Sequence, residues 1–304
     1  MTQNKTLHIY LNKSVLEKAR KGKVGIVNKV VETMQGRGFV TKLQIDTEAE
    51  RLKSVNNQGY SLFRMKDPFH DRAMTFRQVY LPPFWQIETT AKRWEWKTAK
   101  AEFEPEIINE KNADWFVNYW GGVIFDQIQA VNHGNYVFVP LQGRLLLQRS
   151  FQTATPIEMI KITLRYSQGR RVIASLHPQE DYSARELAAL EAIADNNDRF
   201  SWVKGGSDEL LQGCEYVVTQ NSGMAFKGYF LHKPVLLFGY IDFHHIAIKA
   251  WESGQEQAFR QITETKPEYN KYLFWFLRHM SIHAGRDDAA DKIITAFQSG
   301  GWDV

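Results

Sequence analysis

The sequence predicts an α/β protein with two Rossmann-like domains that face a cleft, followed by C-terminal helices. Three observations support this prediction. Strand-like and helix-like segments alternate in both halves of the chain. With 304 residues, 43% of them hydrophobic, the chain is long enough for two cores. A single cysteine, Cys214, excludes an intrachain disulfide framework.

The longest apolar runs, 234–239 and 272–277, fall well short of the roughly 18 residues of a membrane span, so we expect a cytoplasmic protein.

The first half reads as β-α-β-α-β. Apolar residues at helical spacing run from Val24 to Met34, and Gly36 can end that helix. The expected strands are 7–11, 39–45 and 60–65, and the expected helices are 24–34 and 47–55. The region 67–120 holds five of the nine tryptophans and shows few clear periods. It therefore yields no assignment of elements.

The second half is more regular. Thr155 with Glu158, and Ser183 with Glu186, have the spacing of capping boxes that begin helices. The expected strands are 136–142, 171–177, 200–204, 215–220 and 234–239, and the expected helices are 156–167, 183–196, 207–213 and 222–232. This alternation indicates a parallel sheet covered on both faces. Two more helices are expected within 268–300.

These elements divide the chain into two expected domains. Residues 1–132 form an N-terminal Rossmann-like domain, joined by the C-terminal helices 268–304, and residues 133–267 form a C-terminal one. Ligands of such sheets bind outside the carboxyl ends of the strands. The residues that follow each strand are therefore the first candidates for a site.

Charge is distributed unevenly between the two halves. Residues 1–100 hold 19 Lys and Arg against 9 Asp and Glu, a net charge of +10, and the remaining residues hold 19 against 25, a net charge of −6. A basic first half favours an anionic partner, and the alternative is a solvated basic face. We expect no nucleic-acid partner, because no DNA- or RNA-binding module is recognisable.

Two strands of the second half end in residues that suit a phosphate. Arg144 follows the strand 136–142 and can pair with an anion, although a surface loop also explains it. His177-Pro178 ends the strand 171–177. A histidine there can donate to a phosphate or ribose oxygen, although such a dipeptide is usually a structural turn.

A third strand, 215–220, leads directly into a helix. Thr219, Asn221, Ser222 and Gly223 surround the junction. Asn221 or Ser222 can cap the helix, and Gly223 permits a ligand to approach the N–H groups there. The same residues also fit an ordinary junction between a strand and a helix. No metal site is expected, because no HExxH-type spacing is present and adjacent histidines seldom ligate one ion.

The order of these motifs resembles the bacterial capsule polysaccharide synthesis family. The matching features are VPLQ at 139–142, His177-Pro178, the segment 219–223, and HKPVLLFG at 232–239. That family contains GT-B glycosyltransferases that use CMP-Kdo, and the layout is also similar to GT-B bacterial sialyltransferases. The resemblance covers about residues 136–240, a third of the chain.

This resemblance implies a GT-B-like glycosyltransferase of capsular or surface polysaccharide biosynthesis. It implies that a sugar, such as one of the Kdo type, passes from a CMP-activated donor to an anionic glycan or glycolipid acceptor, with no other cofactor. His177 and Ser222 would hold the donor phosphate, with Arg144 as a further candidate. The acceptor base would come from the first half, where the candidates are Asp67, His70 and Glu88, with Asp126 as a fourth.

Two alternatives stay open. One is a non-catalytic glycan- or nucleotide-binding protein of the same fold that serves polysaccharide assembly or export. The other is a GT-B enzyme, or an epimerase of that fold, that uses UDP- or GDP-sugars. Peripheral contact of the basic half with the inner face of the membrane is also left open.

Overall fold

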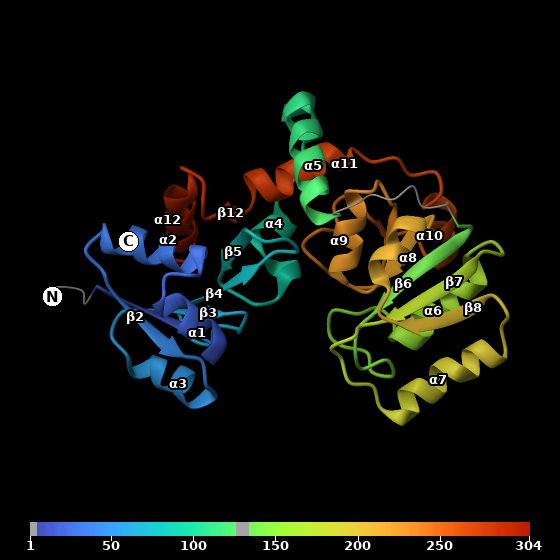
Figure 1. Cartoon of the computed structure of the whole chain (residues 1–304), viewed down its shortest axis with the longest axis horizontal. Coiled ribbons are helices and arrows are strands. Elements are labelled where there is room, and N and C mark those ends of the chain that lie inside the picture. The colour runs from blue at the N-terminus through green and yellow to red at the C-terminus, as the bar shows by residue number, and fades with distance from the viewer. Residues whose placement is uncertain (1–4, 126–133) are drawn as a thin grey trace. The chain divides into compact units, whose positions relative to one another are not determined.

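The computed structural model describes residues 5–125 and 134–304 (Figure 1). The chain forms two compact units. The first contains the residues up to Lys100 together with Phe276–Val304, and the second is Ala101–Trp275. Each unit is built around a six-stranded sheet. The chain therefore leaves the first unit once and returns to it near the C-terminal end.

The first unit holds a mixed sheet in the order β12-β5-β4-β3-β1-β2. Its elements are β1 (Thr6–Leu11), α1 (Lys13–Arg20), α2 (Gly25–Gln35), β2 (Val40–Ile45), α3 (Glu48–Lys53), η1 (Ser54–Asn56), β3 (Tyr60–Arg64), β4 (Ala73–Gln78), β5 (Phe84–Glu88), η2 (Arg93–Glu95), α4 (Lys97–Lys100), β12 (Ile282–His283) and α12 (Ala289–Ser299). Strands β1 to β4 run parallel, and β5 is antiparallel to both β4 and β12.

The predicted β-α-β-α-β order is confirmed by β1, α2, β2, α3 and β3. In α2 the buried residues Ile26, Val27, Val30 and Met34 follow the helical period, which is why the sequence predicts this helix. Helix α1 is not predicted, because it buries only Leu16 and Ala19 and gives little periodic signal. Strands β4 and β5 lie in the tryptophan-rich region, where no pattern predicts them.

The last helix of the chain completes the first core. Residues of α12 pack in one cluster with β1 and α2. Trp302 stacks on Tyr60 with ring centroids 4.4 Å apart, and Asp303 N donates to the Tyr60 hydroxyl at 2.8 Å. The first unit thus depends on contacts between residues more than 240 positions apart.

The second unit holds a parallel sheet in the order β11-β10-β9-β6-β7-β8. Its elements are η3 (Pro105–Ile107), α5 (Glu110–Ile124), β6 (Tyr136–Leu141), α6 (Pro156–Tyr166), β7 (Arg171–Leu176), α7 (Ala184–Asp195), β8 (Phe200–Lys204), α8 (Ser207–Gly213), β9 (Tyr216–Thr219), α9 (Gly223–Tyr229), β10 (Val235–Leu237), β11 (Ile248–Lys249), α10 (Gln255–Gln261) and α11 (Tyr269–Phe274), after which a π-helical turn, η4 (Trp275–His279), crosses into the first unit.

Both predicted capping boxes are confirmed. Thr155 and Glu158 exchange side-chain and backbone hydrogen bonds at the start of α6, and Ser183 and Glu186 do so at the start of α7. The two helices expected within 268–300 correspond to α11 and α12, which lie in different units.

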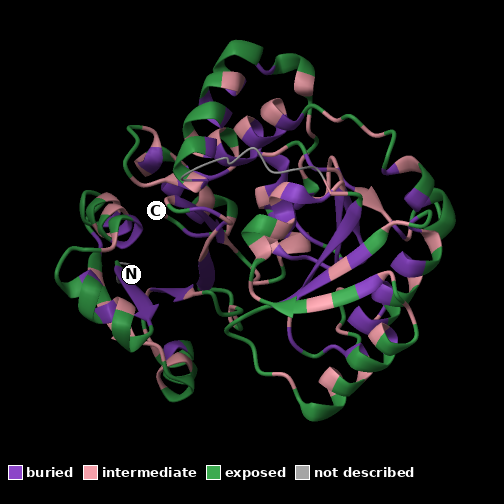
Figure 2. Ribbon diagram, turned by 45° about the vertical axis from the view of Figure 1, so that its right-hand side comes forward, coloured by how far each residue is buried: buried purple, intermediate pink, exposed green. Residues whose placement is uncertain are grey.

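The central strands of the second sheet are buried (Figure 2). All six residues of β6 are buried, as expected for a strand covered on both faces. Strand β6 has β7 on one side and β9 on the other, so the chain order reverses beside it. Such a switch point is where α/β sheets bind ligands, at the carboxyl ends of the strands. No helix in the described residues combines the length and apolar character needed to cross a bilayer.

Candidate functional site

The switch point of the second sheet carries a small polar recess. It is lined by residues at the carboxyl ends of β6 and β9 and in the segments that follow them, namely Pro140, Leu141, Gln142, Arg149, Pro156, Thr219, Gln220, Asn221 and Ser222. Its volume is about 10 Å³, close to the minimum for one water molecule. The recess is therefore the floor of a candidate site and not a ligand cavity by itself.

Hydrogen bonds hold the chain in place at the end of β9 and at the start of α9. Thr219 Oγ1 donates to Pro140 O and accepts from Ser222 N, both at 3.3 Å, which ties the end of β9 to β6. Ser222 Oγ accepts from Met224 N at 3.3 Å and so caps α9. Thr219, Asn221 and Ser222 are all buried. The predicted phosphate contact of Ser222 remains a prediction, and its hydroxyl already serves the cap.

His177 is exposed directly after β7. Its Nδ1 accepts from Gln179 N at 3.2 Å, so the neutral ring carries its proton on Nε2. Its backbone N–H donates to the Tyr182 hydroxyl at 2.9 Å. Pro178 begins the turn that this hydrogen bond closes. The turn therefore fixes the ring as a donor through Nε2.

Two arginines follow β6. Arg144 is exposed and has a left-handed backbone, with φ of 66°. Arg149 is half-buried, and its guanidinium lies 4.8 Å from the centre of the Phe151 ring. Burial lowers the pKa of Arg149, the charge of Arg144 lowers it further, and Glu180 raises it. A bound anion would relieve the repulsion between the two cations.

Three buried polar atoms at this site have no hydrogen-bond partner among the described residues. They are Arg149 Nε, Gln152 Nε2 and Gln220 Oε1. The other ends of both amides are used, because Gln152 Oε1 accepts from Arg149 N at 2.7 Å and Gln220 Nε2 donates to Ala154 O at 2.9 Å. A buried polar group left unpaired costs about 1–3 kcal/mol. These atoms therefore mark a place for water or ligand.

The sequence prediction included Arg144 but missed Arg149, Gln152 and Gln220. Arg149 lies eight positions after the end of β6, in a loop without periodicity. The glutamines belong to no recognisable motif. A search for arginines in the whole loop between β6 and α6 would have found Arg149.

The base candidates lie in the first unit. Asp67 Oδ1 accepts from Ala91 N at 2.6 Å and from Thr90 Oγ1 at 3.2 Å, so this carboxylate holds the loop after β5. His70 Nε2 lies 2.9 Å from Ser54 Oγ, and its buried Nδ1 has no partner among the described residues. Burial lowers the pKa of His70.

Glu88 is the third base candidate and ends β5. Because β5 is antiparallel, Glu88 lies opposite Thr75, near the amino end of β4. Its Oε1 accepts from Lys97 N at 3.1 Å. Asp67 and His70 thus share the loop between β3 and β4, whereas Glu88 belongs to a different pocket. Asp126 lies outside the described residues.

The adjacent histidines after β10 have other roles. His244 Nδ1 lies 2.7 Å from Ile241 O, and His245 Nδ1 lies 3.0 Å from the Tyr272 hydroxyl. Within residues 5–125 and 134–304, no group of three or more His, Cys, Asp or Glu side chains is arranged to hold a metal ion.

Comparison with solved structures identifies the fold. No protein-family model matches the chain, and a search of curated proteins finds no match. Thermosulfurimonas dismutans KpsC, a β-Kdo 2,7 transferase, is similar with a TM-score of 0.54 and 12% identity, over 98% of this chain and 100% of that one. A β-Kdo 2,4 transferase structure of KpsC from the same organism gives a TM-score of 0.50 and 10% identity, over 88% of this chain and 89% of that one.

These likenesses extend over both units, whereas the resemblance found in the sequence covers only a third of the chain. They confirm that resemblance at the level of the fold. The chain has the two-domain α/β fold of these two Kdo transferase structures, with two Rossmann-like units of the GT-B type.

Proposed function

We propose that this protein is a glycosyltransferase of capsular or surface polysaccharide biosynthesis that binds a CMP-activated sugar, of the Kdo type, at the carboxyl edge of its second sheet. The observation that carries the proposal is the group of cationic and donor side chains at the switch point. Arg149 lines the recess, where buried polar atoms have no partner among the described residues, and Arg144 and His177 follow the adjacent strands β6 and β7. The shared fold with two Kdo transferases supports the choice of donor.

The chemistry required is stabilisation of a departing phosphate. Negative charge grows on the nucleotide phosphate as the bond to the sugar breaks, so fixed donors there lower the barrier. The guanidinium of Arg149 and the Nε2–H of His177 are such donors. Glu180 limits the positive charge of the site, which favours a monophosphate over a more highly charged ligand.

The acceptor hydroxyl needs a base from the first unit. His70 is the first of the three candidates, because burial lowers its pKa and so favours the neutral ring that a base requires. Asp67 and Glu88 are the other candidates. The charge of +10 over residues 1–100 suits an anionic glycan or glycolipid acceptor.

The first experiment is nucleotide binding by thermal shift and calorimetry with CMP, UDP, GDP and ADP. A ligand at 100 times its Kd stabilises the native state by about 2.7 kcal/mol. We expect stabilisation by CMP, followed by CMP release from CMP-Kdo in the presence of acceptor. Stabilisation by UDP or GDP alone would contradict the donor, and no stabilisation by any nucleotide would contradict a nucleotide site.

Variants locate the site. Arg149→Ala and His177→Ala should each lower CMP affinity at least tenfold. The first matched control is Arg260→Ala, at an exposed arginine paired with Glu256 on α10. The second is His232→Ala, at an exposed histidine that precedes β10 and so lies at the amino ends of the strands. Both controls should bind CMP as the unaltered protein does. Equal loss in variants and controls would show a general defect and not a site.

A further inference from the structure

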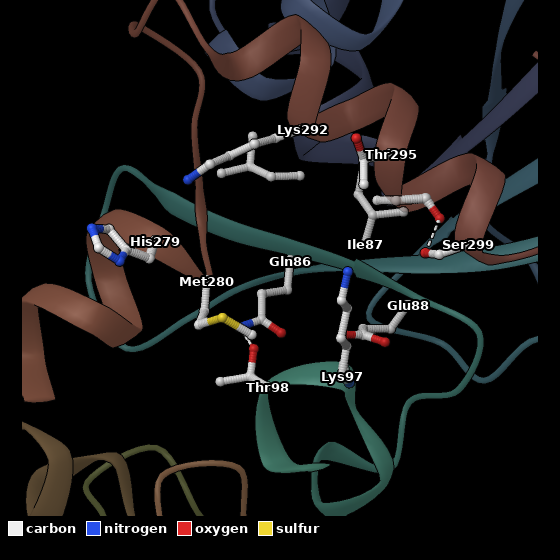
Figure 3. Close-up of a pocket in the computed structure, with 12 residues that line it drawn as sticks. Gln86, Ile87, Glu88, Lys97, Thr98, His279, Met280, Lys292, Thr295 and Ser299 are labelled. Carbon is white, nitrogen blue, oxygen red and sulfur yellow. Dashed lines mark hydrogen bonds between the residues drawn. The ribbon is translucent and has the colours of Figure 1, made fainter. Parts of the chain in front are cut away.

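The first unit contains a polar pocket of its own. It has a volume of about 190 Å³ and lies among β5, α4, β12 and α12 (Figure 3). The lining residues are Gln86, Ile87, Glu88, Lys97, Thr98, His279, Met280, Ile282, Lys292, Thr295, Ala296 and Ser299. All of them belong to the first unit.

Gln86 places an unpartnered polar atom in this pocket. The residue is only 4% exposed, and its Nε2 donates to Thr98 Oγ1 at 2.6 Å. Its Oε1 has no partner among the described residues. Exchanging the nitrogen and oxygen of the amide would leave an NH₂ group in the same position, so the conclusion is independent of the assignment. A ligand group that pairs with this amide removes a cost of about 1–3 kcal/mol.

Two lysines give the pocket a positive character. Lys97 is exposed, and its Nζ has no ion-pair or hydrogen-bond partner in the part of the chain that the structure describes. Lys292 Nζ donates to Arg278 O at 2.7 Å and to Ser281 O at 2.8 Å. An ammonium group has three protons, so one remains for a further acceptor. Glu88 is the only carboxylate in the lining. Asp288 Oδ2 lies 3.9 Å from Lys292 Nζ, but Asp288 also pairs with Arg278 and Arg286, so positive charge is in excess.

The remaining lining fits a carbohydrate. Hydroxyls of Thr98, Thr295 and Ser299 alternate with apolar groups such as Ile87 and Met280. Figure 3 shows the Gln86 amide in the middle, with Lys97 and Glu88 on one side and Lys292 and His279 on the other. A sugar ring offers both C–H faces and hydroxyl groups. The pocket is smaller than the roughly 300–1,000 Å³ of sites for drug-sized ligands, so it suits one ring.

We propose that this pocket binds one acidic sugar residue. The carboxylate of the sugar pairs with Lys97, and its hydroxyl groups pair with the Gln86 amide, the Glu88 carboxylate and the remaining proton of Lys292. The assignment of this sugar to the acceptor glycan rests on the proposed function. The binding itself does not, because the pocket lies wholly within the first unit.

The test is calorimetry of the full chain with methyl β-D-glucuronide, methyl β-D-galacturonide, methyl β-D-glucoside and inorganic phosphate. We expect a uronide to bind at least tenfold more tightly than the neutral glucoside. Lys97→Met and Gln86→Leu should each lower that affinity at least tenfold. Lys100→Met is the matched control, because Lys100 is exposed on the same helix and does not line the pocket.

The outcomes separate the two proposals. Uronide binding without any nucleotide binding would contradict the transferase and support this pocket. Nucleotide binding without uronide binding would support the transferase and contradict this pocket. Equal binding of phosphate and uronide would show a plain anion site and overturn sugar recognition. Uronide binding unchanged in both folded variants, as judged by their melting temperatures, would overturn the pocket as its location.

Discussion

The carboxylate of Glu180 lies directly against Gly143. A Cβ atom placed on Gly143 would come within 2.7 Å of Glu180 Oε2. The two residues follow β6 and β7, so this contact joins the ends of adjacent strands beside Arg149. The absence of a side chain at position 143 therefore allows an acidic group to sit next to the proposed phosphate donors.

A pair of glycine variants tests this arrangement. Gly143→Ala should lower the free energy of unfolding by less than about 1 kcal/mol, because the end of a flexible side chain can move aside. Gly239→Ala should cost about 1–3 kcal/mol, because its Cβ would lie 2.9 Å from Gln220 O and 3.1 Å from Phe151 O, both backbone atoms. Urea unfolding of the two proteins measures the difference. Equal losses of unfolding free energy in the two variants would contradict this difference between side-chain and backbone neighbours.

Cys214 should be inert in the folded protein. The residue is fully buried, and burial raises the pKa of its thiol to about 12. The thiolate is the reactive form, so Ellman's reagent at pH 8 should label Cys214 only as fast as the chain unfolds. Full labelling should follow at once in denaturant. Rapid labelling without denaturant would show that this part of the second unit opens locally.

Uronide binding should weaken above pH 8. Burial lowers the pKa of Lys292 from 10.5 to about 8, so its charge is lost as pH rises through that value. Affinity should fall several-fold between pH 7 and 9.5, and Lys292→Met should remove most of this change. The other charged or titratable groups that face Lys292 or share its pocket are Asp288, Arg278, Arg286, His279, Lys97 and Glu88. A pH-independent affinity would contradict a role for Lys292.

Titration of Lys292 does not by itself destabilise the fold over this range. Between pH 8 and 10.5 the unfolded chain binds more protons at Lys292 than the folded chain does. This group alone therefore makes the folded state more stable as pH rises. Melting temperatures recorded across the same range provide the control.

His70→Gln tests the base of the proposed reaction. General-base catalysis typically contributes 10²- to 10⁴-fold to the rate, so kcat should fall by about that factor while CMP affinity stays unchanged. Asp67→Asn should have a smaller effect on kcat, because Asp67 already accepts two hydrogen bonds from the loop after β5. Initial rates of CMP release measure both. A His70 variant with full activity would exclude it as the base.

The Thr155 cap offers a prediction about stability alone. Thr155→Ala removes the hydroxyl that accepts from Glu158 N at 3.1 Å, and Glu158 Oε2 would keep only its bond from Thr155 N. Such a loss costs about 1 kcal/mol. Chemical unfolding should show that decrease with CMP affinity unchanged. A change in affinity would mean that α6 also supports the site.

The parts of the fold that the sequence predicts are those with a local signal. Helix α2 repeats its buried residues at helical spacing, and α6 and α7 begin with capping boxes. Strands β5 and β12 are not predicted from the sequence. Strand β5 pairs with β12 about 200 positions later, and β12 has only two residues and therefore no period. Pairing of that kind depends on the tertiary fold.

The residues of the candidate sites also divide into those with a local sequence signal and those without one. His177 and Arg144 are found because they lie one and three positions after the ends of strands. Arg149 and Gln220 matter through burial and unpaired atoms, which no spacing indicates. The pocket around Gln86 combines residues from β5, α4 and α12, so only the folded chain brings them together.

The interrupted first unit has a consequence for synthesis of the protein. Domains generally fold as they leave the ribosome, with the N-terminal part first. Here the first 100 residues emerge without β12 and α12, which supply an edge strand and part of their core. The second unit, although later in the chain, is continuous and has all its strands before residues 276–304 are made. We therefore expect the second unit to fold first on the ribosome, and the first unit to complete its fold only after residues 276–304 have emerged.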